Sequence, residues 1–246
     1  MIPDPVLEVV VTSAEEAVAA VAGGADRLEV ATDMHADGMT PALAEFRRVR
    51  ASVDVPLRVM LRDHGVFRAP DPERLRDTAA ALRAAGADAF VLGFLTPEAA
   101  LDLPAMTAVL SAVPGCRWTF HRAMDHAADR AAVRSALHVL PGLGTILTAG
   151  SVTGGRGRAD RPPLGTGRAR PRRLRHGGRP LLPGHVHALR AHGIRAFHIG
   201  DLHVHLVPRR EADHLHRPWQ ATRADAAALA ATRRRILDPG SRRPLP

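Results

Sequence analysis

The segment from Pro5 to Thr32 reads PVLEVVVTSAEEAVAAVAGGADRLEVAT and contains three consecutive elements of secondary structure. Its two ends, residues 5–11 and 26–32, are short runs rich in valine and leucine, which is typical of buried strands. Between them, Ser13 followed by Glu16 predicts the start of a helix, and Gly23-Gly24 predicts its end. A strand, a helix and a strand joined by short turns predict a right-handed βαβ unit with parallel strands.

The same alternation continues along the chain. Further strands are predicted at 55–61, 88–95, 116–121, 144–148 and 194–200, and helices at 41–51, 71–85, 103–112, 128–139, 183–192 and 221–237. The helix at 41–51 is expected to have Thr40 as its cap and Pro41 at its first position. Six such units in about 150 residues leave room for two more, and eight units in about 250 residues predict an α/β fold, a TIM-type (β/α)8 barrel. The alternative, a doubly wound sheet, would normally carry a Gly-rich phosphate turn after its first strand.

The pattern breaks between Gly154 and Arg179, where a sixth helix and a seventh strand should lie. This segment holds nine arginines, one acid and little apolar sequence, so the strand 6 to strand 7 region is expected to be irregular. Leu181-Leu182 is the predicted remnant of strand seven. Three interpretations stay open: a disordered basic arm, an insertion without a role, or a translated reading-frame error. The last predicts that another frame of the gene encodes an amphipathic helix and a strand here. We expect one domain over residues 1–240 and a tail over 241–246.

Composition narrows the class of protein. The net charge of +9 comes almost wholly from the Arg-rich segment, and the rest of the chain has a net charge of +1, so we expect no nucleic-acid partner. The single cysteine, Cys116, excludes an intrachain disulfide and favours a reducing compartment. Neither a signal peptide nor a membrane-spanning run is seen, so a cytoplasmic protein is expected. A homo-oligomer stays open.

Charged residues inside or after the predicted strands point to a site. Glu8, Arg27 and Glu29 lie within the first two strands, where an unpaired charge is expensive, so Arg27 or Arg62 is expected to pair with the carboxylates. Catalytic sites of such barrels lie where the strands end. The segment CRWTFHRAMD, residues 116–125, ends a strand with three groups able to exchange protons or bind anions. Further polar residues at or near strand ends are Arg62, His121, Arg122, Asp125, Thr148, Ser151 and His198.

Several motifs in this order resemble the CutC family of copper homeostasis proteins. They are GADRLE (residues 24–29), DGMTP (37–41), TFHRAMD (119–125) and LTAGS (147–151). The resemblance covers residues 5 to 153, fails after Gly154, and returns weakly through 187–200. It implies a TIM-type barrel and places the family's polar cluster on Glu8, Arg27, Glu29, Arg62, His121, Arg122 and Asp125.

The resemblance also implies a function in copper binding or copper homeostasis, with copper as the ligand. One departure bears on this expectation. Some members carry cysteines after the first two strand glutamates, where this chain has Val10, Val11 and Ala31. Since Cu(I) prefers thiolate or thioether ligands, the metal-binding residues stay unknown.

The alternative is an enzyme that acts on a small anionic substrate. In that hypothesis His121, Asp125, Glu8 and Glu29 are the catalytic residues, and His121 is the acid or base that Asp125 or Glu29 orients. The substrate-binding residues would be Arg27, Arg62, Arg122, Thr148, Ser151 and His198, with Arg62 and Arg122 holding the anion.

Overall fold

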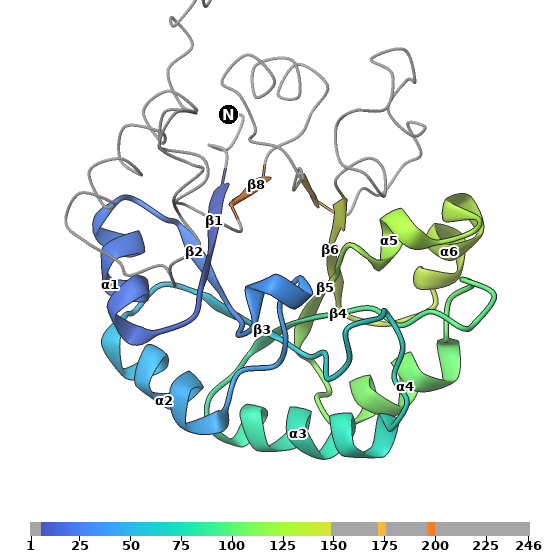
Figure 1. The fold of residues 1–246 in the computed structure, drawn as a ribbon, viewed down its shortest axis with the longest axis horizontal. Helices are drawn as coiled ribbons and strands as arrows, with labels where there is room; N and C mark the ends of the chain where they lie inside the picture. The colour runs from blue at the N-terminus through green and yellow to red at the C-terminus, as the bar shows by residue number, and fades with distance from the viewer. Residues whose placement is uncertain (1–5, 149–171, 176–195, 200–246) are drawn as a thin grey trace, which may run out of the picture.

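Eight parallel strands form a closed ring in the computed structural model, which describes residues 6–148, 172–175 and 196–199 (Figure 1). Each strand pairs with the next in the sequence, and the last pairs with the first. The predicted TIM-type barrel is therefore confirmed. The strands are β1 (Val6–Val11), β2 (Arg27–Val30), β3 (Leu57–Met60), β4 (Ala89–Leu92), β5 (Arg117–Phe120), β6 (Leu143–Thr148), β7 (Arg172–Arg175) and β8 (Ala196–Ile199).

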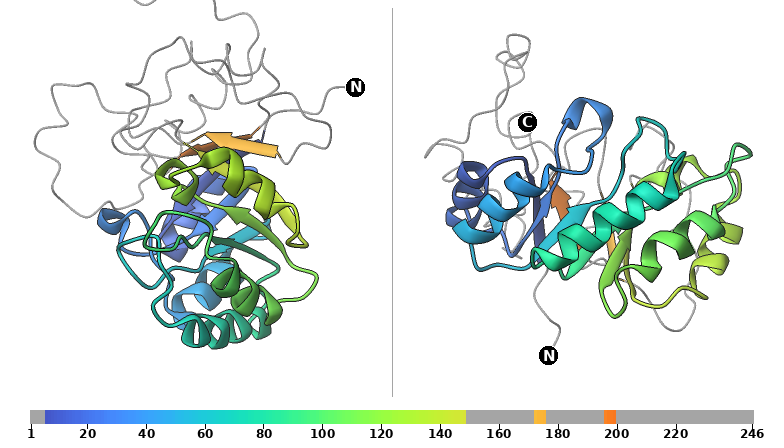
Figure 2. Two further views of the ribbon diagram at one scale, coloured as in Figure 1. Left: turned by 90° about the vertical axis from the view of Figure 1, so that its right-hand side faces the viewer. Right: turned by 90° about the horizontal axis from the view of Figure 1, so that it is seen from below.

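The described helices lie outside this ring (Figures 1 and 2). They are α1 (Ala14–Ala22), the 3-10 turn η1 (Met34–Ala36), α2 (Leu43–Ser52), α3 (Pro72–Ala84), α4 (Leu103–Ser111), α5 (Ala123–His126) and α6 (Arg130–Leu137). Side-chain oxygens of Ser13, Asp71, Asp102 and Asp129 accept hydrogen bonds from first-turn amides of α1, α3, α4 and α6. These caps satisfy amides that have no partner within the helix and fix where each helix begins. None of the described helices is long and apolar enough to cross a membrane.

The start of α2 differs from the prediction. The helix begins at Leu43 with Ala42 before it, and Thr40 does not cap it. The Thr40 hydroxyl instead accepts a hydrogen bond from the backbone N–H of Arg62 (2.8 Å) and donates to its carbonyl (3.0 Å). A tertiary partner therefore takes the hydroxyl that local sequence assigns to a cap, and this contact joins the loop after β2 to the end of β3.

The position of the seventh strand also differs from the prediction. The strand is Arg172–Arg175, inside the Arg-rich segment, and not Leu181-Leu182. Its backbone pairs with β6 on one side and with β8 on the other. A strand between two others is defined by its backbone hydrogen bonds to them. The side-chain pattern RRLR carries no sign of those bonds. The rest of 154–179, the predicted helices at 183–192 and 221–237, and the tail lie outside the described residues.

The alternation along β1 shows how the strands divide core from interior. Leu7, Val9 and Val11 are buried in the main apolar core, the layer shared with the helices. Glu8 and Val10, the intervening residues, face the inside of the ring and are buried as well.

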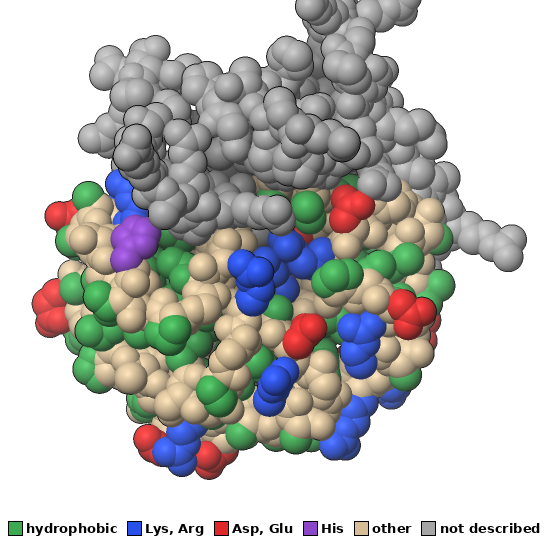
Figure 3. All heavy atoms as spheres, turned by 180° about the vertical axis from the view of Figure 1, so that it is seen from behind, with side chains coloured by type: hydrophobic (Ala, Val, Ile, Leu, Met, Phe, Trp, Pro, Cys, Tyr) green, Lys and Arg blue, Asp and Glu red, His purple; other side chains and the backbone are tan. Residues whose placement is uncertain are grey.

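On the far side of the molecule from Figure 1, basic side chains near the centre of the face are mixed with acidic ones (Figure 3). The described part of that face therefore presents no continuous basic surface.

Candidate functional site

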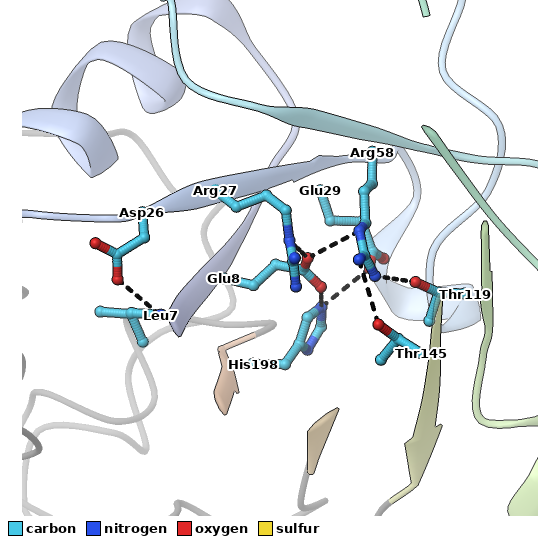
Figure 4. Close-up of polar contacts among 9 residues, drawn as sticks. All are labelled: Leu7, Glu8, Asp26, Arg27, Glu29, Arg58, Thr119, Thr145 and His198. Carbon is cyan, nitrogen blue, oxygen red and sulfur yellow. Dashed lines mark hydrogen bonds and ion pairs between the residues drawn. The ribbon is translucent and has the colours of Figure 1, made fainter. Parts of the chain in front are cut away.

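A network of buried and half-buried polar side chains lies inside the barrel (Figure 4). We call it the interior network, and its members come from six strands: Glu8, Arg27, Glu29, Arg58, Thr119, Thr145 and His198. Parallel pairing sets these positions, because Glu8 lies opposite Arg27 on β2 and opposite His198 on β8. Residues remote in the sequence are thereby brought to one level of the ring.

Glu8 is the centre of the interior network. Its carboxylate is fully buried, forms a close ion pair with Arg27 and lies 3.5 Å from the Nε of Arg58. Burial alone would raise the pKa of Glu8, but Arg27, Arg58 and His198 outweigh it and lower that pKa. Glu8 is therefore ionised in the folded protein at neutral pH.

His198 joins both carboxylates. Its Nε2 lies 3.2 Å from Glu29 Oε2 and 4.0 Å from Glu8 Oε1. Burial would lower the pKa of His198, but Glu29 and Glu8 raise it above its ordinary value. The last described strand thus supplies an imidazole to carboxylates on the first two.

Sequence reasoning missed three members of the network, Arg58, Thr119 and Thr145, of which Arg58 is the charged one. It donates to the hydroxyls of Thr119, in a close contact, and Thr145, at 3.2 Å. The expected partner of the strand carboxylates was Arg27 or Arg62; Arg27 fills this role, but Arg58 takes the place of Arg62 because it is on the inward face of β3 at the level of Glu29. A charged residue within a buried strand was the available signal, the same signal that identified Glu8.

An apolar layer lies next to the interior network on the side where the strands end. Val10, Ala31, Met60 and Val91 form a separate buried cluster. Three of them follow Glu8, Glu29 and Arg58 by two residues, so they share the inward face one step further along each strand. The interior network is therefore buried below the mouth of the barrel and does not line it.

A second polar group lies at the mouth, beyond the strand ends. We call it the mouth cluster: Asp37, Arg62, Phe67, His121, Arg122, Asp125, His126 and Thr148. Of the predicted site residues, Arg62, His121, Arg122, Asp125 and Thr148 belong here, whereas Glu8, Arg27, Glu29 and His198 belong to the interior network. Ser151 lies outside the described residues.

Arg62 acts as a clamp between two loops. Its guanidinium donates to the carbonyls of Asp37 and Gly38, in the loop after β2, and to those of His64 and Gly65, in the loop after β3. It also lies 4.6 Å from the ring centroid of Phe67. These four hydrogen bonds use most of the five N–H donors of the side chain. An anion-binding role for Arg62 stays a prediction.

His121 is the buried imidazole of the mouth cluster and is 2% exposed. Its Nδ1 accepts a hydrogen bond from the backbone N–H of Ala123 at 3.3 Å. Its Nε2 is buried without a hydrogen-bond partner among the described residues. Burial, with Arg62, Arg122 and His126 nearby, lowers the pKa of His121 to about 3. The ring is therefore neutral at physiological pH.

Arg122 and Asp125 complete the mouth cluster. Arg122 pairs with Asp37 at 3.0 Å, and its Nε is 3.9 Å from Asp125 Oδ2, beyond hydrogen-bond reach. That Nε is buried with no hydrogen-bond acceptor among the described residues. Asp125, on the short helix α5, accepts a close hydrogen bond from Thr148 and does not contact His121. The hydrogen bond that the described residues give the His121 ring comes from the Ala123 amide, and its orientation by Asp125 or Glu29 stays a prediction.

The interior network contains a group of atoms that could serve as metal ligands. Single ligand atoms of Glu8, Glu29 and His198 lie within 4.8 Å of one another. Glu8, however, already forms ion pairs with Arg27 and Arg58, and Glu29 already pairs with His198. A cation bound there would leave a buried guanidinium unpaired, which is strongly unfavourable. The donors are also oxygen and imidazole nitrogen, not the sulfur that Cu(I) prefers.

The one cysteine does not supply the missing sulfur ligand. Cys116 immediately precedes β5, at the end of the barrel opposite the mouth, and burial raises the pKa of its thiol. The described residues therefore do not fit a thiolate copper site. The sequence also contains three His-x-His pairs, a spacing typical of metal ligands, at 185–187, 203–205 and 214–216, and all three lie outside the described residues.

Comparison with known proteins identifies relatives of the first two thirds of the chain. The sequence model of the CutC family matches residues 5–160. A CutC family protein of Xanthomonas campestris pv. campestris is 37% identical over 148 residues, which are 59% of this chain and 61% of that protein. A human copper homeostasis protein cutC homolog is 33% identical over 147 residues, 58% of this chain and 54% of that protein. The matched region thus spans about three fifths or less of these curated relatives.

Solved structures resemble the chain in fold. A crystal structure from Streptococcus agalactiae that carries the CutC name has a TM-score of 0.67 at 19% identity and covers 79% of this chain and 97% of that one. A dihydrodipicolinate synthase from Bacillus anthracis has a TM-score of 0.55 at 12% identity and covers 96% of this chain and 79% of that one. At these identities the likeness shows the barrel fold alone.

Proposed function

This chain belongs to the CutC family, and on that premise we propose that the mouth of its barrel binds a small substrate through an anionic or carbonyl oxygen. The chain is a homologue of copper homeostasis proteins. The single observation that carries the proposal is the presence of two buried donors, His121 Nε2 and Arg122 Nε, that have no acceptor among the residues the structure describes.

Unpaired buried donors are the reason to expect a ligand. A buried donor left without an acceptor costs roughly 1–3 kcal/mol. Native proteins rarely leave such groups unpaired, and exceptions often belong to functional sites. A ligand oxygen would satisfy such a donor, and the guanidinium of Arg122 would strengthen its hydrogen bond to a carboxylate or a phosphate. This supports the hypothesis of an enzyme or binding protein for a small anionic substrate.

Anion-dependent thermal stability tests this proposal. Inorganic phosphate and acetate, each compared with chloride at equal ionic strength, should raise the melting temperature of the full chain. A ligand at ten times its Kd stabilises by about 1.4 kcal/mol. For a chain of this size that corresponds to a shift of about 3–6 °C.

The matched variants are Arg122→Gln and Arg48→Gln. Arg122→Gln should abolish most of the anion-dependent shift because it removes the Nε–H donor and the charge. Arg48 is an exposed residue of α2, its side chain 70% exposed, so Arg48→Gln should keep the shift. A wild-type protein insensitive to every anion, or equal loss in both variants, would contradict the proposal.

Copper is the second candidate ligand, because the human relative carries a copper homeostasis name. The observation that favours an interior site is the proximity of Glu8, Glu29 and His198. Titration of Cu(I) against a competing chelator, on wild type and His198→Gln, tests that trio. The neighbouring guanidiniums and the oxygen and nitrogen donors of the trio disfavour Cu(I). We therefore expect wild type and His198→Gln to bind Cu(I) with equal affinity. A weaker affinity in His198→Gln would return copper to the interior of the barrel.

A further inference from the structure

We infer that His121 is a fixed hydrogen-bond donor, which presents Nε2–H to a carbonyl, carboxylate or phosphate oxygen of the substrate and serves as neither acid, base nor metal ligand. The inference deepens the proposed function of the mouth and rests on it. It assigns a role different from the acid–base role that the sequence suggests for this histidine.

The tautomer follows from one hydrogen bond. The backbone N–H of Ala123 can only donate, so the Nδ1 atom that it contacts at 3.3 Å must carry a lone pair. A neutral imidazole has one protonated nitrogen, and the proton must then be on Nε2. Nε2 is therefore a donor and offers no lone pair to a metal ion or to a proton.

The packing around the ring holds it in this orientation. Gly93 lies against it so closely that a Cβ at that position would be 2.8 Å from Nδ1 and 3.0 Å from the neighbouring ring carbon. Phe67 meets the imidazole edge-on, with the ring centroids 5.2 Å apart, and Phe120 lies at 6.2 Å. A flipped ring would place the Cδ2–H against the Ala123 amide and lose this hydrogen bond.

The charges around His121 oppose a second proton. The groups that act on it are Arg62 from the end of β3, and Arg122 and His126 from the segment that follows β5. No carboxylate among the described residues contacts the ring to stabilise an imidazolium. The ring therefore stays neutral through the physiological range and keeps a single donor.

The geometry also limits the ligand. The donor is buried one residue before Arg122, whose Nε–H likewise lacks an acceptor in the described part of the chain. Two donors favour a ligand group that only accepts hydrogen bonds, such as a carboxylate, a phosphate or a carbonyl. If charge develops on that oxygen during a reaction, a prearranged neutral donor would stabilise it without moving a proton.

Nuclear magnetic resonance tests the tautomer without any ligand. In the full chain labelled with 15N-histidine, the ring signals of His121, assigned by their loss in His121→Gln, should show protonated Nε2 and unprotonated Nδ1. This pattern should stay unchanged between pH 5 and pH 9. An Nδ1–H tautomer, or a titration midpoint near 6.5, would overturn the inference even if anions bind.

Anion affinity tests the donor role. The amide nitrogen of glutamine reaches about as far as Nε2, whereas that of asparagine does not. His121→Asn should weaken binding of phosphate or acetate about 10-fold or more, as expected for a lost hydrogen bond to a charged group. His121→Gln should retain most of the affinity. Equal affinity in wild type and His121→Asn would overturn the donor role. Absence of anion binding in the wild type would instead refute the proposed function and leave the tautomer result standing.

Discussion

His198 Nε2 lies 3.2 Å from Glu29 Oε2, so the imidazole of the last described strand pairs with a buried carboxylate of the second. Replacing His198 by alanine would leave Glu29, which is 2% exposed, without its partner. Loss of one partner from a buried pair costs about 3–5 kcal/mol, and we expect this drop in the free energy of unfolding in urea. His138→Ala, at an exposed position after α6, should change it by less than about 0.5 kcal/mol. Similar stability of the two variants would show that the His198–Glu29 pair is energetically neutral.

The pH dependence of stability should carry separate contributions from two histidines. The pKa of His198 is raised in the folded state, so its stabilising contribution is fully present below the unfolded pKa and is lost as pH rises through the folded value. His121 has a folded pKa of about 3, so between about 6.5 and 3 the unfolded state binds the proton first and acid lowers stability. Each group changes stability by at most about 1.4 kcal/mol per pH unit.

The two contributions separate by substitution. Urea unfolding from pH 4 to pH 9 should show a shallower decrease on the acid side for His121→Gln and a shallower decrease on the alkaline side for His198→Gln. Parallel profiles for wild type and both variants would refute the assigned shifts.

The orientation of the His121 ring should depend on having glycine at position 93. A Cβ there would lie 2.8 Å from Nδ1, so Gly93→Ala should displace the imidazole and break its hydrogen bond with the Ala123 amide. We expect a loss of about 1–3 kcal/mol from overpacking and a change in the His121 ring signals. Gly65→Ala is the control, since no heavy atom lies within 4 Å of a Cβ built there. Unchanged His121 signals in Gly93→Ala would show that the ring does not depend on this contact.

The clamp formed by Arg62 should control how readily its two loops open. Arg62→Lys keeps the charge but replaces a planar fork that reaches four carbonyls by a single ammonium. Limited proteolysis within residues 33–38 and 63–67 should therefore become several-fold faster, because opening of these loops will require less free energy. Arg68→Lys, in the same loop but exposed, should be cleaved at the wild-type rate. Equal cleavage rates in both variants would contradict the clamp.

The sequence predicted the fold where each element carries its own signal. The strands before residue 148 begin and end within a few residues of the predicted ones, because period-2 apolar runs and helix caps are local features. Arg172–Arg175 could not be predicted in this way, since pairing with β6 and β8 defines it. The family match ends at residue 160, within the Arg-rich segment, and the reading-frame interpretation stays a prediction about the gene.

The sequence predicted most residues of the candidate site, but it did not predict that they divide into two separate groups. Parallel strands bring Glu8 and His198 opposite each other, and that required only the βαβ pattern. The two levels, one sealed inside the ring and one at the mouth, depend on which residues face inward at each step, and Arg58 shows how easily one is missed. The tautomer of His121 depends on a single amide contact, which no sequence motif encodes.

Closure of the ring by β7 and β8 has a consequence for truncated forms of the chain. A product that stopped at Thr148 would retain β1 to β6 but leave the outer edges of β1 and β6 with unsatisfied amides and carbonyls. Exposed edges of this kind recruit strands from other molecules. Such a fragment would therefore precipitate or self-associate. By covering the edge of β6, the tetrapeptide Arg172–Arg175 would keep the protein in solution as well as complete the barrel.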